Sequence, residues 1–362
     1  MKVLYVYPFC GLGGVETSII NKIEALKSLK IHAEAILLNV WSEGGKYILN
    51  NNIKGNLTIE EIINILNKDF DVITIIDYPQ FINLINKLNI KSKIIYETHC
   101  SELDQIKKSC NVVNHKKISA IIVPSIFNRE TILKLTKTNK KIFVLYNPIN
   151  MKQFTNIPNT QLDKSYQKFL NKRNVIWIGR LEKNKNPIEF IKMGNILLRN
   201  NKDLHFIMIG DKCGNHSYFR FIKSNIPKNY ISNYTFFHSI PNKKMPELFS
   251  LAANTGGCLV SSSENESLPM IFLEAMACKC PIISTDVGGV RELIVNNKSG
   301  KIYKLNNINE GCKAINELID KENTAVRKEI VNNAYSMVKS RHSIERVAEK
   351  YRIILNHIFQ KQ

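Results

Sequence analysis

Short runs of β-branched and aliphatic residues alternate with helix-like patterns along almost the whole chain. In the first part of the chain, strands are expected at residues 2–7, 33–39, 72–76, 93–96, 120–123 and 142–145. Helix patterns lie between them, at residues 15–29, 59–67, 79–88 and 125–135. Continuous apolar strands separated by helices are typical of a parallel sheet that is covered on both faces. The alternation therefore predicts an α/β fold.

A polar stretch at residues 147–173, which contains Pro148 and Pro158, interrupts this alternation. The pattern then resumes, with strands expected at residues 175–178, 204–209, 235–237, 257–260, 281–284 and 301–303. Further helices are expected at residues 187–198, 243–251, 269–277, 290–295, 308–320, 325–339 and 343–358. We therefore predict two tandem, Rossmann-like, doubly wound parallel-sheet domains.

The length of 362 residues agrees with about two domains. We place the first domain at residues 1–150, a linker at 151–173 and the second domain at 174–342. The last helix, at 343–362, is expected to return to the first domain. Ligands of open α/β sheets bind outside the carboxyl ends of the strands, so we expect a site in a cleft between facing domains.

Composition excludes several classes of protein. Hydrophobic residues make up 44% and charged residues 23%, as in ordinary globular proteins. No apolar run reaches the ~18 residues of a membrane-spanning helix, and the amino terminus does not resemble a signal peptide. Without C-x-x-C pairs, the eight cysteines are expected to be reduced thiols of a cytoplasmic protein. They are Cys10, Cys100, Cys110, Cys213, Cys258, Cys278, Cys280 and Cys312.

Positive charge is the strongest compositional bias. The chain has 51 Lys and Arg residues against 31 Asp and Glu residues, a net charge of +20. Such a field favours nucleotides, nucleic acid or an acidic membrane surface. A helix expected at residues 106–118, with four lysines, fits an anionic membrane surface, but the pattern favours a solvated basic face. We find no nucleic-acid-binding signature and expect no nucleic-acid partner.

Two β-to-α turns carry groups suited to a phosphorylated ligand. The first contains Gly13, Gly14 and Glu16, but Glu16 stands where a dinucleotide fingerprint needs its third glycine. Glycines there let a ligand approach the backbone at a helix N-terminus, although such turns are common in this fold class. The second contains Arg180 and Lys185, which suit a diphosphate but also fit two solvated loop cations.

A third cluster surrounds a helix expected to begin near Pro269. Glu266 lies at the mouth of this helix, and Glu274 lies among apolar residues within it. A buried carboxylate there needs a partner such as a hydroxyl pair or a cation. The free N–H groups around residues 267–270 suit a phosphate. Alternatively, Glu266 is a surface cap and Glu274 faces solvent.

Together these residues resemble the retaining glycosyltransferases of GT-B architecture, in the family 4-like, group 1, E-x7-E set. The resemblance rests on Glu266-x7-Glu274, on the run at residues 273–278, on Gly179-Arg180-Leu181 with Lys185-Asn186, and on residues 13–16. Segments 120–129, 146–149, 286–289 and 292–294 also stand in family order. The sequence departs from the family at residues 267–269, Ser-Leu-Pro for a glycine-aromatic pattern, and at Lys279, where glycine is usual.

The resemblance implies a role for each residue. Glu274 would hold the ribose hydroxyls of a nucleotide donor and Glu266 the hydroxyls of the donor sugar, while Arg180 and Lys185 would neutralise the diphosphate. His99 would lie beside the reacting sugar. The implied catalytic set is Glu266, His99, Arg180 and Lys185. The implied donor-binding set is Gly13, Gly14, Glu16, Gly179, Arg180, Lys185, Glu266, Ser267, Leu268, Pro269, Met270 and Glu274.

The implied reaction is the retaining transfer of a hexose or N-acetylhexosamine from a nucleoside-diphosphate sugar, with UDP favoured over GDP. Its acceptor would be a hydroxyl of a cell-surface glycan, such as a polysaccharide or lipopolysaccharide, or of a lipid-linked molecule. The enzyme would work in the cytoplasm or on the inner face of the plasma membrane. The alternatives are a nucleotide-sugar epimerase and a catalytically silent partner subunit.

No metal or other cofactor is expected. Asp69 and Asp71 form an Asp-x-Asp motif, but they precede a strand and so lie at the wrong end of the sheet for a ligand site.

Overall fold

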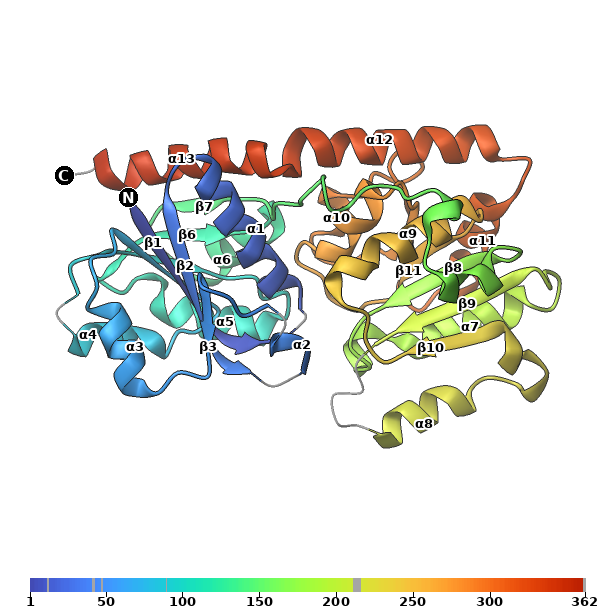
Figure 1. Ribbon diagram of the computed structural model, residues 1–362, viewed down its shortest axis with the longest axis horizontal. Coiled ribbons are helices and arrows are strands. Elements are labelled where there is room, and N and C mark those ends of the chain that lie inside the picture. The colour runs from blue at the N-terminus through green and yellow to red at the C-terminus, as the bar shows by residue number, and fades with distance from the viewer. Residues whose placement is uncertain (12, 41–42, 47, 89, 211–215, 361–362) are drawn as a thin grey trace. The chain divides into compact units, whose positions relative to one another are not determined.

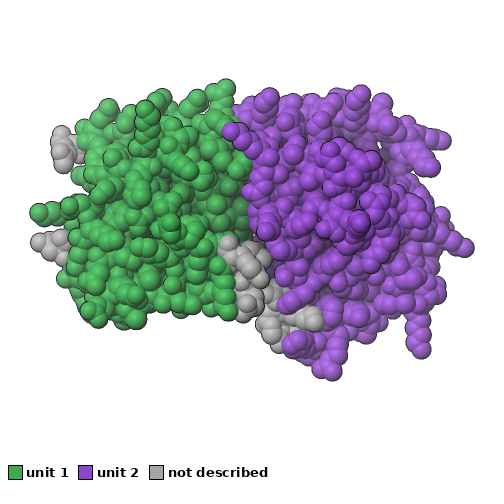
Figure 2. Space-filling view, viewed as in Figure 1, with its two compact units in different colours: residues 1–150, 341–362 green, residues 151–340 purple. Residues whose placement is uncertain are grey.

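The computed structural model describes residues 1–11, 13–40, 43–46, 48–88, 90–210 and 216–360 (Figure 1). Cys213 lies outside these residues. The chain forms two compact units (Figure 2). Unit 1 comprises residues Met1–Asn150 and Arg341–Gln362, and unit 2 comprises Met151–Ser340. No helix in the described residues combines the length and apolar character needed to cross a bilayer.

In the described part of unit 1, seven parallel strands form one sheet in the order β3-β2-β1-β4-β5-β6-β7. The strands are β1 (Lys2–Cys10), β2 (His32–Val40), β3 (Ile53–Gly55), β4 (Val72–Ile76), β5 (Lys93–Glu97), β6 (Ile118–Val123) and β7 (Ile142–Val144). The helices are α1 (Gly14–Ser28), α2 (Glu43–Lys46), α3 (Ile59–Leu66), α4 (Phe81–Lys87), α5 (Leu103–Val113), α6 (Ile126–Leu135) and α13 (Ile344–Gln360).

Unit 1 has a hydrophobic core on each face of its sheet. Side chains of a strand alternate between faces, and β1 places Val3 and Tyr5 in one core and Leu4 in the other. Helix α13 packs against α1 and contributes Val347 and Tyr351 to the first core. Burial on both faces explains why these strands read as continuous apolar runs.

Unit 2 contains a parallel sheet that, within the described residues, has six strands in the order β10-β9-β8-β11-β12-β13. The strands are β8 (Arg173–Ile178), β9 (Leu204–Ile209), β10 (Tyr234–Phe237), β11 (Cys258–Ser261), β12 (Ile282–Thr285) and β13 (Lys301–Tyr303). The helices are α7 (Pro187–Leu197), α8 (His216–Ser224), α9 (Met245–Asn254), α10 (Met270–Ala277), α11 (Ile308–Ile319) and α12 (Thr324–His342), of which the last two residues of α12 belong to unit 1.

Several local expectations differ from the structure. Residues 151–173, expected as a linker, belong to unit 2, where the Ile157 N–H donates to Ser250 Oγ (2.9 Å). The helix expected at 106–118 ends at Val113, because Ile118 already begins β6. At 290–295 the structure has a short 3-10 turn, Val290–Glu292. The short elements α2 and β3, and helix α8, were not expected.

Candidate active site

The site in unit 2 lies where the order of the strands reverses. Strand β8 lies beside both β9 and β11, so the turns that leave β8 and β11 start side by side. Such a switch point, at the carboxyl ends of the strands, is where open α/β sheets bind ligands. Gly179 and Arg180 follow β8, and residues 262–266 follow β11. The predicted diphosphate turn and the predicted carboxylate cluster therefore start from neighbouring strands.

Hydrogen bonds join these two loops. Ser262 Oγ donates to the carbonyl of Asn186 at 2.8 Å, and the Glu264 N–H donates to the carbonyl of Asn184 at 2.8 Å. Helix α7 begins directly afterwards, because the Asn186 side chain caps it and Pro187 occupies its first turn. Lys185 is therefore held just before the start of α7, as the sequence predicts.

Lys185 and Glu266 form an ion pair, with Lys185 Nζ 2.7 Å from Glu266 Oε1. Both side chains are largely buried. The turn that follows β12 contacts the backbone of Glu266, because the Gly289 N–H donates a hydrogen bond to the Glu266 carbonyl at 2.9 Å. Gly288 has φ +52°, and a Cβ at this position would lie 1.8 Å from the same carbonyl oxygen. The backbone thus sets the position of Glu266.

Glu274 is buried within α10, with 4% of its surface exposed. This excludes the alternative in which it faces solvent. Asn242 Nδ2 lies 3.5 Å from Glu274 Oε1, and Asn242 Oδ1 accepts a hydrogen bond from Gln153 Nε2 at 2.7 Å. Burial raises the pKa of the Glu274 carboxyl to about 7, although the bond from Asn242 opposes this rise.

The other residues predicted for this site lie around it. Ser267 and Leu268 are buried, Pro269 caps the N-terminus of α10 and Met270 begins it. Arg180 is 54% exposed, and its Nη1 lies 3.1 Å from Glu182 Oε1. Arg180 is therefore paired with an acid other than the one that pairs with Lys185.

In unit 1, the predicted glycine-rich turn is folded around Glu16. This side chain is 4% exposed, and its Oε1 accepts a hydrogen bond from the Gly11 N–H at 2.9 Å. A Cβ on Gly13 would lie 2.5 Å from Glu16 Oε2, so a side chain there would displace the end of the Glu16 side chain. Gly13 caps α1 in an extended conformation, and Gly14 begins the helix.

His99 follows β5 at the carboxyl edge of the same sheet. Its Nε2 lies 2.5 Å from Glu97 Oε1, and its backbone N–H donates to Asp77 Oδ1 at 3.0 Å. Lys22 Nζ donates to the same Glu97 oxygen. Glu97, Lys22 and, in unit 2, Asn242 were missed from the sequence. Gly288 lies in segment 286–289, which stands in family order, but no role at the site was assigned to it.

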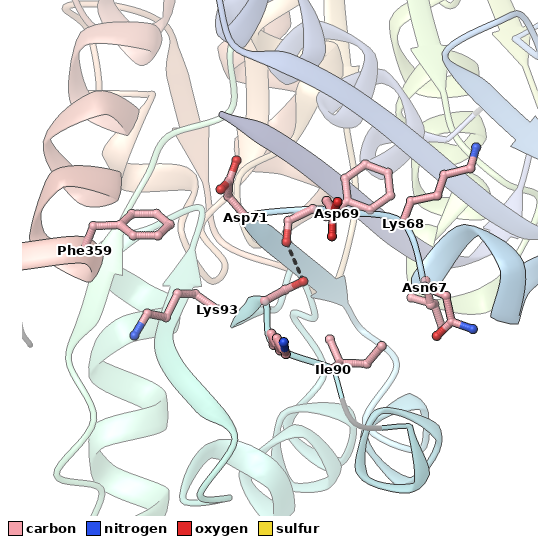
Figure 3. A pocket seen from close by; sticks show the side chains of 11 residues that line it. Asn67, Lys68, Asp69, Asp71, Ile90, Lys93 and Phe359 are labelled. Atoms are coloured by element: carbon pink, nitrogen blue, oxygen red, sulfur yellow. Dashed lines mark hydrogen bonds between the residues drawn. The ribbon is translucent and has the colours of Figure 1, made fainter.

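Asp69 and Asp71 line a pocket of about 520 Å³ at the opposite, amino end of the sheet of unit 1 (Figure 3). Asp71 Oδ2 accepts a hydrogen bond from the Lys2 N–H at 2.7 Å, and Ser92 Oγ donates to the Phe70 carbonyl at 2.6 Å. Among the described residues, no group of three His, Cys, Asp or Glu side chains could hold a metal ion.

Comparison with known proteins identifies the family. The sequence profile described as "Glycosyl transferases group 1" matches residues 158–337, which lie within unit 2. The chain belongs to the group 1 glycosyltransferases. This confirms the predicted family and an enzymatic activity, and it favours glycosyl transfer over the epimerase and silent-subunit alternatives.

Curated relatives of this glycosyltransferase are distant. The capsular polysaccharide biosynthesis glycosyltransferase CapM of Staphylococcus aureus is 26% identical over 231 residues, which cover 61% of this chain and 57% of CapM. The poly(ribitol-phosphate) alpha-N-acetylglucosaminyltransferase of the same species is 24% identical over 334 residues, which cover 88% and 63% of the two chains. The chain thus spans about three fifths of the length of each relative.

Solved structures confirm the predicted fold class. The Anabaena protein HepE, crystallised with UDP-glucose, superposes with a TM-score of 0.82 and 17% sequence identity. The match covers 99% of this chain and 100% of HepE. The two parallel α/β sheets of this glycosyltransferase are therefore those of the GT-B architecture.

Proposed function

We propose that the enzyme transfers a hexose or N-acetylhexosamine from a UDP-sugar to a hydroxyl group, with retention of the anomeric configuration. The observation that carries this proposal is the buried carboxylate of Glu274 in α10, together with the Lys185–Glu266 pair on the loops at a strand switch point. HepE, which shares the fold, was crystallised with UDP-glucose and supports UDP as the nucleotide. GDP remains the second candidate.

In this proposal Glu274 accepts hydrogen bonds from both ribose hydroxyls of the donor. A carboxylate has about four acceptor positions, and within the described residues one contact, to Asn242, is found. A hydroxyl pair supplies the missing donors and stabilises the ionised form of the buried acid. Residues Ser267, Leu268, Pro269 and Met270 then present the start of α10 to the diphosphate, where the N–H groups favour an anion.

Lys185 changes its partner when the donor binds. In the free protein its ammonium group pairs with Glu266. A diphosphate carries more negative charge than one carboxylate, so it attracts the ammonium group and leaves Glu266 free to accept hydrogen bonds from the sugar hydroxyls. Arg180, on the turn that also contains Gly179, adds a second cation.

The reaction then needs no covalent intermediate on the enzyme. The bond between the anomeric carbon and the diphosphate oxygen breaks, and the acceptor oxygen bonds to the same face of that carbon. The leaving phosphate oxygen takes up the hydroxyl proton. Arg180 and Lys185 supply preorganised positive charge where negative charge develops, and no metal ion is required. From unit 1, we assign contacts with the donor to Gly13, Gly14 and Glu16, and one with the reacting sugar to His99.

The acceptor is proposed to be a cell-surface glycan or its lipid-linked precursor. Its support is the activity in the names of two relatives, one in capsular polysaccharide biosynthesis and one acting on poly(ribitol-phosphate). Lipopolysaccharide is an alternative acceptor of the same class.

Release of UDP from UDP-sugars in the presence of such an acceptor tests the function. Removing one group that stabilises developing charge lowers kcat by about 10²–10³-fold, which we expect for Lys185→Ala. Lys183→Ala, an exposed cation in the same turn, is the matched control and should stay within about twofold of the wild type. Equal activity of Lys185→Ala and the control would contradict the assigned role of Lys185.

A further inference from the structure

A chain of three buried polar side chains lies beneath the carboxyl edge of the sheet in unit 1. Lys22 comes from the middle of α1, Glu97 ends β5 and His99 follows two residues later. Their side chains are 0%, 1% and 7% exposed, respectively. Glu97 Oε1 accepts hydrogen bonds from both Lys22 Nζ and His99 Nε2. We call this set the Lys22–Glu97–His99 chain.

The ion pair in this chain is not explained by stability. Burying two charges costs about as much free energy as their attraction returns, and apolar residues of similar volume often stabilise a fold at least as well. Glu97 Oε2 is also buried, and within the described residues it has no hydrogen-bond partner. We therefore consider how the Lys22–Glu97 pair affects the protonation of His99.

The surroundings keep Glu97 ionised. Burial opposes its ionisation, but the charge of Lys22 and the hydrogen bonds from His99 and Lys22 act against burial, and the pKa of the carboxyl is lowered to about 2. The hydroxyls of Tyr5 on β1 and Tyr351 on α13 lie 3.0 Å apart nearby, and burial raises the pKa of both, so both remain protonated. An ionised carboxylate is an acceptor only, and hence His99 Nε2 must carry the proton in this contact.

Lys22 changes the electrostatic effect of that carboxylate. An unpaired carboxylate would favour the protonated imidazolium, whereas an ammonium group on the same oxygen cancels the charge that His99 experiences. Asp77 meets His99 at the backbone N–H and fixes its loop. Within the described residues, His99 Nδ1 has no hydrogen-bond partner.

We propose that Lys22 and Glu97 are positioning residues that hold His99 as a neutral imidazole, with the Nε2 proton directed to Glu97 and Nδ1 available as an acceptor. This inference rests on the proposed function, because a neutral acceptor at Nδ1 suits a hydroxyl of the donor sugar or the acceptor. An imidazolium would present a donor instead.

The tautomer of His99 can be observed directly in the whole protein. In protein labelled with ¹⁵N-histidine, two-bond ¹H–¹⁵N correlations distinguish the two neutral tautomers, and His99→Asn assigns the signal. We expect the Nε2–H form in the wild type. In Lys22→Met we expect the doubly protonated imidazolium form to replace this neutral form near neutral pH, because the compensating charge is gone. An Nδ1–H form or a mixture of tautomers in the wild type, or the same neutral form in Lys22→Met, would overturn the proposal.

Activity provides the second readout. Lys22→Met should lower kcat at least about tenfold near pH 6 and less at pH 8, because more of His99 is then imidazolium at the lower pH. Lys27→Met, an exposed lysine of the same helix, is the matched control. If Lys22→Met does not fold, Lys22→Met/Glu97→Gln removes both charges and should lose the Nε2–H preference. Failure of the proposed glycosyl transfer would leave the tautomer result unaffected, so the two failures are distinguishable.

Discussion

At the scale of single residues, the site contains charged side chains that are buried, and their burial lowers the stability of the ligand-free protein. Glu274 is the clearest case, since a carboxylate that is 4% exposed has one long contact, to Asn242. Such a group is costly in the free protein and becomes favourable when a ligand supplies hydrogen-bond donors. A carboxylate at this position therefore favours binding of the donor but lowers the stability of the ligand-free protein.

The burial of Glu274 predicts that the stability of the wild type, relative to a variant that cannot ionise at this position, depends on pH. The pKa of Glu274 is about 7 in the fold against an ordinary value of 4.5. The folded state binds this proton more tightly than the unfolded state does. The protonated side chain therefore makes its full contribution to the free energy of unfolding below pH 4.5, and this contribution is lost as the pH rises through 7. The free energy of unfolding falls by about 3 kcal/mol over this range, at 1.36 kcal/mol per pKa unit.

Glu274→Gln cannot ionise, so without ligand it should melt several degrees above the wild type at pH 8 and close to it at pH 4.5. Thermal unfolding followed by circular dichroism measures this difference. A melting-temperature difference that does not change with pH would contradict the burial of an ionisable carboxylate.

At the scale of elements, the site depends on turns whose backbone packs directly against the backbone of a neighbouring loop. The turn after β12 presses Gly288 against the carbonyl of Glu266, and Gly288 has a positive φ. Any side chain at this position must push the Glu266 loop away. The geometry of one loop thus determines where the carboxylate of another lies.

We expect Gly288→Ala to weaken donor binding at least about tenfold and to destabilise unit 2 by more than the 1–2 kcal/mol of a left-handed backbone alone. Gly256→Ala separates the two effects. Gly256 also has a positive φ, of 78°, but a Cβ there meets nothing closer than Arg173 at 3.7 Å. This control should lose stability and keep its affinity, as measured by calorimetric titration with UDP-glucose, which carries the sugar that Glu266 is proposed to contact. Equal affinities of both variants would show that the turn does not position Glu266.

The elements that could be predicted from sequence are those whose burial is uniform. Strands β4 and β9 have the expected bounds because every residue of both is buried, which produces apolar runs that only Thr74 and His205 interrupt. Strand β3 escaped prediction because it has three residues and ends in Gly55. The extension of α5 beyond Val113 was wrong because residues that precede a strand can continue a helical pattern.

Site residues could be predicted where they belong to a sequence motif. They could not be predicted where their role depends on a contact with a residue that is distant in the sequence. Glu266 and Glu274 were found from their spacing, but α10 is apolar on all sides, so its pattern could not decide whether Glu274 is buried. Its partner Asn242 lies 32 residues away. Lys22 resembles a surface residue of α1, and its burial depends on Glu97, 75 residues later.

At the scale of the whole molecule, two features stand out: unit 1 is discontinuous in sequence, and the chain is basic. The chain leaves unit 1 at Asn150 and returns at Arg341, after which α13 completes one of its cores. The charge of +20 includes a local excess at residues 102–141, with nine basic and three acidic residues. Helices α5 and α6 of this segment pack on each other and expose Leu103, Ile126 and Leu133.

We propose that this basic segment binds an anionic membrane surface, since each Lys or Arg near such a surface contributes about 1 kcal/mol. The protein should cosediment with vesicles that contain about 30% anionic lipid at ~0.15 M salt, and not with neutral vesicles. Lys134→Glu/Lys137→Glu should weaken this binding, and Lys313→Glu/Lys328→Glu in unit 2 controls for net charge. Equal binding of both variants, or no binding by the wild type, would leave the segment as a solvated basic face.

The central claim is that unit 2 binds a nucleoside diphosphate through Glu274. Calorimetric titration of the wild type, Glu274→Gln and the exposed control Glu329→Gln with UDP, in buffer without metal ions, tests it most directly. Two hydrogen bonds to a charged group contribute about 1.5–3 kcal/mol each. We therefore predict that UDP binds the wild type and the control equally, and Glu274→Gln at least about tenfold more weakly. Equal affinity of all three proteins, or no binding by the wild type, would contradict the account.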